Sequence, residues 1–170
     1  MRGPSSDILP GVSFTEWLLF LHVAAAFAVV AAITVFTILV VVGRRIDRPA
    51  DAVAIFRIGD PANILVQAGS VVALLVGIWL AIRLPEYHPW DGWLIGAYVL
   101  WAIAGGAGGV TGKEYERIRK SAQQLVAEGK LEPSATLRAE LRSTKALVLH
   151  LVVVAAVLAL LADMIFKPGA

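Results

Sequence analysis

Three ionisable side chains interrupt otherwise apolar stretches of this 170-residue chain: His22, His150 and Asp163. Ionisable groups inside long apolar segments are costly to bury, so each one is a functional hypothesis. A histidine can ligate haem iron or a divalent metal ion, and an aspartate can pair with a protonated histidine or accept a proton. Whether these residues form a site depends on the elements that carry them.

Four apolar runs make up most of the chain, which is 58% hydrophobic and only 16% charged. A soluble domain is normally about a quarter charged, whereas about 20 apolar residues suffice to cross a bilayer. Backbone polar groups in lipid must be bonded internally, which predicts helices. The predicted fold is therefore all-α: a single integral membrane domain over residues 1–170, arranged as a four-helix up-down bundle. The predicted spans are residues 17–42, 62–82, 93–110 and 146–166.

Basic residues are distributed unequally between the two sides of these spans. Twelve of the 15 Lys and Arg residues fall in segments 44–57 and 113–145, and only Arg2, Arg83 and Lys167 fall on the other side. The positive-inside rule then predicts both basic segments in the cytoplasm and both termini outside. The basic segments are expected to contact anionic lipid headgroups and no nucleic acid. Four tryptophans agree with the predicted outer boundary: Trp17, Trp79, Trp90 and Trp93.

The cytoplasmic segments are predicted to be largely helical. The third and fourth helices should extend beyond the membrane and turn near residues 129–133, where Gly129 suits a helix end. Residues 49–57 are expected to form a separate short helix on the inner surface. Asp60 and Pro61 would then begin the second span, as N-cap and first helical residue.

Depth along the spans predicts a polar pair near the outer boundary. At about 1.5 Å per residue, His22 on the first span and Asp163 on the fourth lie at similar depth, and these spans are neighbours in an up-down bundle. A hydrogen bond or ion pair between the two side chains is predicted. Lys167, one helical turn after Asp163, is expected to compete for the carboxylate.

Two further sets of residues are predicted to hold the bundle together. His150 lies near the inner boundary, where the start of the second span offers Asn63 and Gln67 as partners. Gly105 and Gly109 have the four-residue spacing that lets helices approach closely in lipid. This spacing favours packing within the bundle, and a dimer face is the alternative.

Interhelical bonding is the leading interpretation of the polar residues, and no cofactor is predicted. The alternative is a membrane redox protein that binds haem b or a metal through His22, with His88 in the outer loop as a further metal-ligand candidate. A bis-histidine haem is disfavoured, because His22 and His150 should lie about 15 Å apart along the membrane normal. A proton or ion path through His22 and Asp163 is a third interpretation. The chain has no cysteine, which excludes thiolate ligation.

Two stretches resemble a known family. LLFLHVAAAFAVVAA (residues 18–32) is similar to the opening span, and LADMIFKPG (residues 161–169) to the usual ending, of bacterial predicted integral membrane proteins classed as domain of unknown function 2269. The resemblance implies a four-span fold and a membrane location, and no activity. The first span also faintly resembles copper-resistance D-type proteins and membrane protoporphyrinogen oxidases, but the tryptophan and glycines that typically follow their histidine are missing here. The sequence favours a non-enzymatic accessory or structural subunit, as a homo- or hetero-oligomer.

Overall fold

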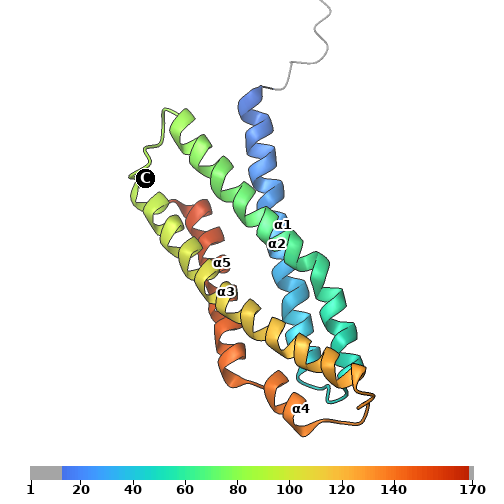
Figure 1. The fold of residues 1–170 in the computed structure, drawn as a ribbon. Helices are drawn as coiled ribbons and strands as arrows, with labels where there is room; N and C mark the ends of the chain where they lie inside the picture. The colour runs from blue at the N-terminus through green and yellow to red at the C-terminus, as the bar shows by residue number, and fades with distance from the viewer. Residues whose placement is uncertain (1–12, 169–170) are drawn as a thin grey trace, which may run out of the picture.

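The computed structural model describes residues 13–168, and all the regular secondary structure in that range is helical. Within it, four helical stretches are long and apolar enough to cross a membrane, the fourth being α4 and α5 taken together. This confirms the predicted four-span all-α fold. Figure 1 shows the elements as one elongated bundle. The helices are α1 (Phe14–Gly43), α2 (Pro49–Arg83), α3 (Gly92–Ala127), α4 (Ala135–Leu141) and α5 (Thr144–Phe166).

The surface of the spans is apolar and their contacts use small residues. Phe27 is 71% exposed and Ile64 is 70% exposed, which suits lipid and not water. The buried positions are mostly small, as expected where helices must approach without a hydrophobic driving force. Among the buried residues of the spans are Ala25, Ala32, Ala62, Ala97 and Ala156.

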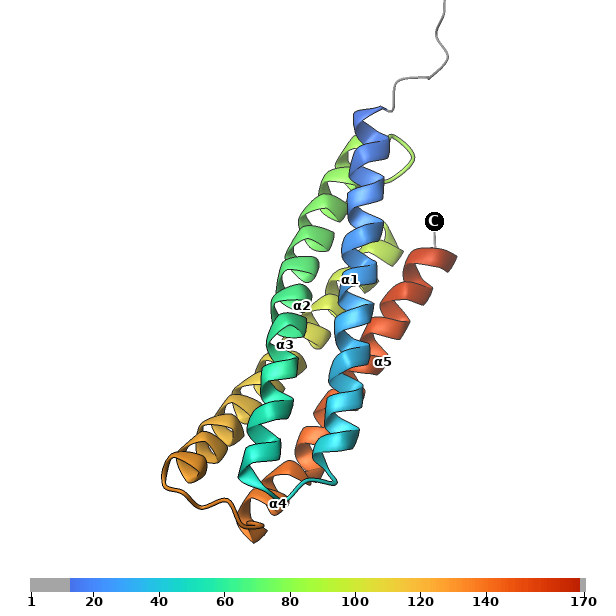
Figure 2. The same ribbon diagram turned by 90° about the vertical axis from the view of Figure 1, so that its right-hand side faces the viewer.

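The spans pack as two pairs, with α1 along α2 and α5 along α3. Figures 1 and 2 show these pairs from two sides. A methyl group at Gly69 of α2 would lie 3.1 Å from the Ala25 carbonyl oxygen of α1, so glycine permits this close approach. The pairs are joined where α2 and α3 meet, through Ala81, Trp93 and Leu94. α1 and α5 touch over a shorter stretch.

The two ends of the bundle differ in chemistry. We call the end that carries residues 44–57 and 113–145 the basic end, and the end that carries Trp17, Trp79 and Trp93 the tryptophan end (Figure 1). At the basic end α3 extends to Ala127, and Gly129 in the following turn has φ 72°. The predicted helical extensions and the turn near residues 129–133 are therefore confirmed.

Two predictions for the basic end are wrong. Residues 49–57 are not a separate helix, because α2 begins at Pro49. Asp60 and Pro61 do not begin a helix, because α2 continues through Pro61. Pro61 has no N–H to bond the carbonyl four residues earlier. The helix persists because its first turns are fixed by packing: Ala52 is buried in a small core with residues of α3 and α4, which are Ile118, Ala122 and Leu137.

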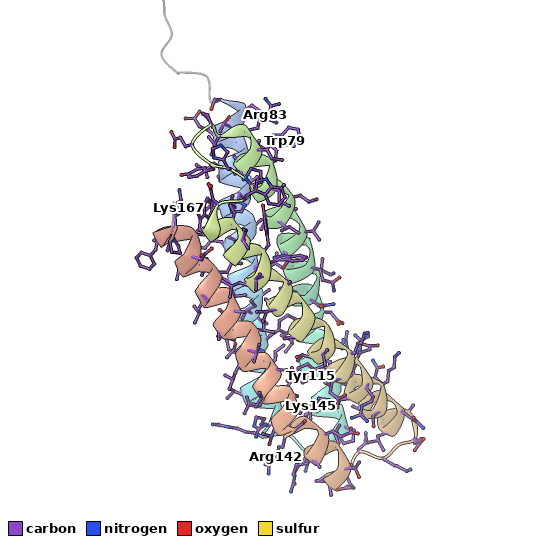
Figure 3. The ribbon with its side chains drawn as sticks, turned by 90° about the vertical axis from the view of Figure 1, so that its left-hand side faces the viewer. Trp79, Arg83, Tyr115, Arg142, Lys145 and Lys167 are labelled. Atoms are coloured by element: carbon purple, nitrogen blue, oxygen red, sulfur yellow. The ribbon has the colours of Figure 1, made fainter. Side chains whose placement is uncertain are left out.

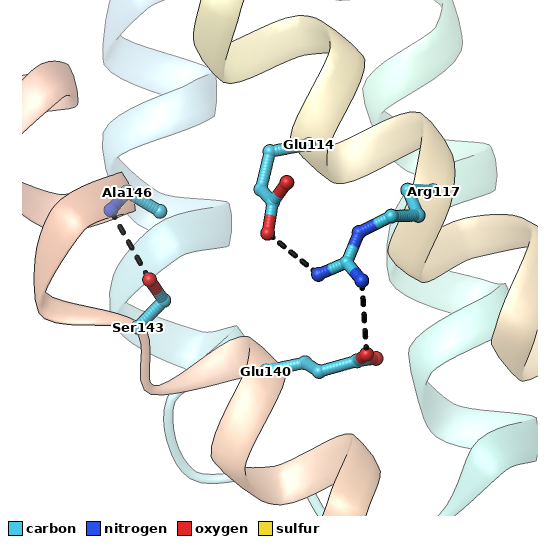
Figure 4. A network of polar contacts seen from close by, with 5 residues as sticks. All are labelled: Glu114, Arg117, Glu140, Ser143 and Ala146. Carbon is cyan, nitrogen blue, oxygen red and sulfur yellow. Dashed lines mark hydrogen bonds and ion pairs between the residues drawn. The ribbon is translucent and has the colours of Figure 1, made fainter.

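The fourth helix is divided into α4 and α5 at Arg142 and Ser143. The Ser143 hydroxyl accepts a hydrogen bond from the Ala146 N–H and so caps α5. Figure 4 shows this cap beside an ion-pair network in which Arg117 of α3 contacts Glu114 at 2.7 Å and Glu140 of α4 at 3.6 Å. The Arg117 side chain is 60% exposed. We therefore assign the network a role in positioning α4 and little contribution to stability.

Candidate functional site

Lys167 lies in an aromatic site at the tryptophan end. The residue follows α5 with φ 42°, and its backbone N–H bonds to the Asp163 carbonyl oxygen at 2.9 Å. Its ammonium donates to the Tyr87 hydroxyl and lies 4.4 Å from the Tyr87 ring centroid and 5.6 Å from that of Trp93. Figure 3 shows Lys167 at the same end as Trp79 and Arg83. The expected competition of Lys167 for the Asp163 carboxylate is therefore wrong, because the aromatic rings hold the ammonium instead.

Asp163 faces α3. A methyl group at Gly96 would lie 3.2 Å from Asp163 Oδ1, so the glycine makes room for the carboxylate. Asp163 Oδ2 is buried without a hydrogen-bond partner among residues 13–168, as is the indole Nε1 of Trp93. Trp93 lies one turn before Gly96 on the same face of α3. The seam between α3 and α5 thus carries an indole donor and a carboxylate acceptor that no other described residue uses.

His22 faces α2 and not α5. Its Nδ1 lies 2.9 Å from the Ala73 carbonyl oxygen, and its ring stands directly over Gly77. Since a carbonyl only accepts, Nδ1 carries the proton, and Nε2 of the neutral ring keeps its lone pair. The predicted His22–Asp163 pair is therefore wrong. The two side chains belong to different helix pairs, His22 to the α1/α2 contact and Asp163 to the α3/α5 contact.

His150 joins α5 to α1. Its Nε2 lies 2.9 Å from Thr37 Oγ1, whose hydroxyl proton is donated to the Ile33 carbonyl at 2.8 Å. Nε2 is therefore the donor. His150 is buried, with 6% of the residue exposed. The predicted inner cluster with α2 is wrong, because its two other members are exposed on the surface of α2: Asn63 and Gln67.

The glycine-rich part of α3 faces outward. No heavy atom would lie within 4 Å of a methyl group at Gly105 or Gly109, and both residues are exposed. A methyl group at their neighbour Gly108 would lie 3.9 Å from Val153 of α5. The interpretation of Gly105 and Gly109 as a packing face within the bundle is wrong for this chain by itself. The dimer-face alternative stays a prediction.

The structure does not bring the candidate metal ligands together. His88 donates its backbone N–H to Asp91 Oδ2 at 2.8 Å, in the turn before α3. His22 is turned toward α2. Over the described range 13–168, no three His, Asp or Glu side chains gather as a metal-binding group.

Sequence reasoning missed the residues that carry two of these contacts. Gly69, Ala73 and Gly77 repeat at four-residue spacing on α2, and this pattern marks the face that receives α1. Tyr87, Trp93 and Lys167 all lie near the predicted outer boundary. An aromatic ring and a lysine at the same boundary can form a cation–π contact, and this signal was available in the sequence.

A comparison with protein families decides the classification of the chain. The model of domain of unknown function 2269, described as a predicted integral membrane protein, matches residues 16–168. The chain belongs to this family. The match confirms the resemblance carried by the His22 span and the Asp163 ending, and the family's description agrees with the four apolar helices.

The classification gives a location and no reaction. This member of the family is an integral membrane protein, and the family description names no activity. No curated protein and no solved structure matches the chain.

Proposed function

We propose that the protein is a non-enzymatic accessory or structural subunit of a bacterial cytoplasmic membrane, acting through contact with another membrane subunit. The observation that supports this is the use of its polar side chains. His22 bonds to α2, His150 bonds to α1, and Lys167 is held by aromatic rings. These groups lie at three separate helix contacts and do not converge on one reaction centre.

The basic end is proposed to lie in the cytoplasm, with both termini outside. The support is the concentration of basic residues at that end. Positive side chains there would also attract the anionic headgroups of the inner leaflet, at about 1 kcal/mol for each charge near the surface.

The surface proposed to contact the other subunit is the glycine face of α3, defined by Gly105 and Gly109. A glycine within a helix costs about 1 kcal/mol relative to alanine. Nothing in the described chain uses the space that these glycines leave open. Close approach of a transmembrane helix from another subunit would use it.

Site-specific photo-crosslinking in native membranes tests this contact. A photoreactive residue at Gly109 should give one discrete protein adduct, and Gly105→Ile should abolish it by filling the face. The matched control places the same residue at Ala31, an exposed position on α1, and should label lipid only. Lipid-only labelling from both positions, or the same adduct from both, would contradict the proposal.

A second candidate function is haem binding through His22, favoured by one observation. The ring donates Nδ1–H to a backbone carbonyl, which is the bond that orients metal-ligating histidines and directs Nε2 to the metal. Visible absorbance of purified protein, before and after dithionite, separates the candidates. The accessory-subunit proposal expects no stoichiometric Soret band. A band that disappears in His22→Ala would replace it with a haem protein.

A further inference from the structure

A lateral crevice of about 120 Å³ lies between α1 and α5, at the depth of the spans. Its polar wall groups are already bonded within α1: the Thr34 hydroxyl donates to the Val30 carbonyl at 2.9 Å, and Thr37 donates to Ile33. The crevice therefore presents hydrocarbon and no free donor. The residues that define it here are Val30, Thr34 and Thr37 of α1 and Val154, Leu158 and Leu161 of α5.

On the side of the crevice toward the basic end, the residue that follows α1 contacts the turn that precedes α5 through a pair of arginines. Arg44 Nη1 donates to the Arg142 carbonyl at 3.0 Å, and Arg142 Nε donates to the Arg44 carbonyl at 2.8 Å. Both partners are neutral, so neither positive charge is compensated. Other arginines of the basic end are paired with carboxylates, among them Arg119 with Asp60 at 3.0 Å.

Positive charge thus accumulates where the α1/α5 seam reaches the basic end. No carboxylate among residues 13–168 lies within 4.0 Å of a side-chain nitrogen of Arg44 or Arg142, and the same is true of their neighbours Arg45 and Lys145. Figure 3 shows Arg142 and Lys145 close together near the start of α5. A guanidinium presents several N–H donors in a planar fork, which matches a phosphate group.

The spacing of the two features fits one lipid molecule. Thr37, at the lower edge of the crevice, is seven residues above Arg44, or about 10 Å along the helix. Val30, at the upper edge, is about 10 Å higher. One leaflet contributes about 15 Å of hydrocarbon. A phosphate at the arginines would therefore place an acyl chain beside the crevice.

We propose that an anionic phospholipid binds in the α1/α5 seam, with its phosphate on Arg44 and Arg142 and one acyl chain in the crevice. This inference rests on the proposed contact of the basic end with anionic headgroups and gives that contact a defined position. The acyl chain would fill the crevice that separates α1 from α5. The lipid would thereby connect the α1/α2 pair to the α3/α5 pair.

Native mass spectrometry of the full chain in detergent tests the site, with phosphatidylglycerol and phosphatidylcholine as the added lipids. The wild type should retain one phosphatidylglycerol in preference to phosphatidylcholine. Arg142→Gln should weaken phosphatidylglycerol binding about fivefold. Phosphatidylcholine binding should weaken less, because its choline ammonium offsets the charge of the phosphate. The glutamine amide can still donate to the Arg44 carbonyl. The control Arg57→Gln removes an exposed charge of α2 and should change neither lipid.

The crevice is tested separately with Thr34→Phe, which fills it and should weaken the binding of both lipids. Ile38→Phe is the matched control, because Ile38 is 56% exposed on α1 and does not line the crevice. Helical circular dichroism checks that each variant is folded.

Three results would overturn the site. If Arg57→Gln weakens binding as much as Arg142→Gln, attraction to the basic end is diffuse, and the proposed headgroup contact survives without a site. If both lipids bind equally to the folded wild type, the headgroup contact fails as well. If soluble glycerol phosphate displaces the lipid completely, the arginines bind the phosphate alone, and the acyl chain gains nothing from the crevice.

Discussion

Replacing Gly77 by alanine tests how His22 is held. The added methyl carbon would lie 2.9 Å from His22 Cε1 and 3.3 Å from Nδ1, so the ring must retreat and lose its bond to the Ala73 carbonyl. An interhelical bond in a membrane is worth about 0.6–2 kcal/mol. Alanine stabilises a helix by about 1 kcal/mol relative to glycine. In the wild type these two effects nearly cancel, so the single variant is uninformative.

The informative quantity is the coupling between the two positions. In a His22→Ala background the collision is absent, and Gly77→Ala should stabilise by about 1 kcal/mol. The effect of Gly77→Ala should therefore differ between the two backgrounds by about 0.6–2 kcal/mol. Reversible unfolding by SDS in mixed micelles, followed by tryptophan fluorescence, measures each free energy.

Gly105→Ala is the matched control, because no heavy atom would lie within 4 Å of its new methyl group. It should have the same effect with and without His22. The assignment of His22 to the α1/α2 contact is refuted if Gly77→Ala also has equal effects in the two backgrounds. A His22 ring turned toward α5 would give that result.

Three further perturbations test other contacts. Lys167→Met should lower the free energy of unfolding by about 0.5–2 kcal/mol, since the ammonium is 4.4 Å from the Tyr87 ring centroid, and Lys167→Arg should restore part of it. Leu137→Ala truncates a side chain that is 1% exposed and should weaken the docking of α4 by about 2–5 kcal/mol. Faster trypsin cleavage between α3 and α5 would measure this loss. The control Leu131→Ala, at an exposed position, should change the cleavage rate little. Tyr115 of α3 packs against the core around Ala52 at the basic end. Burial raises the pKa of its hydroxyl, so its contribution to stability is complete below pH of about 10 and is lost as pH rises through the raised pKa. Tyr115→Phe should abolish that alkaline loss in unfolding curves.

The spans could be predicted from the sequence because the bilayer imposes their length and composition. The turn after α3 was also predictable, since Gly129 takes a positive φ that disfavours other residues. The continuity of α2 from Pro49 to Arg83 could not be predicted. Local rules place a helix start at Asp60 and Pro61, but burial of Ala52 against α3 and α4 stabilises the preceding turns, and such packing is invisible in a local pattern.

The partners of the polar residues were predicted less well, for a geometric reason. Counting residues gives the depth of a side chain, because the rise along a helix is constant. It does not give the direction in which the side chain points, or which helix it meets there. His22 and Asp163 were therefore matched in depth but assigned to the wrong neighbours. The glycines that receive them, Gly77 and Gly96, are better guides, because an imidazole ring or a carboxylate approaches a helix most easily where no side chain intervenes.

The pairing of the helices has a consequence for the order of assembly during synthesis. α1 and α2 are consecutive in the chain, so their hairpin is complete once the second span has been made. α3 meets its main partner α5 only after residues 128–143 have also been made. Until then, the side of α3 that carries Gly96 and Gly108 faces lipid or the insertion machinery. Asp163 is made after all of α3, and we expect it to enter the membrane against the face of α3 that carries Gly96.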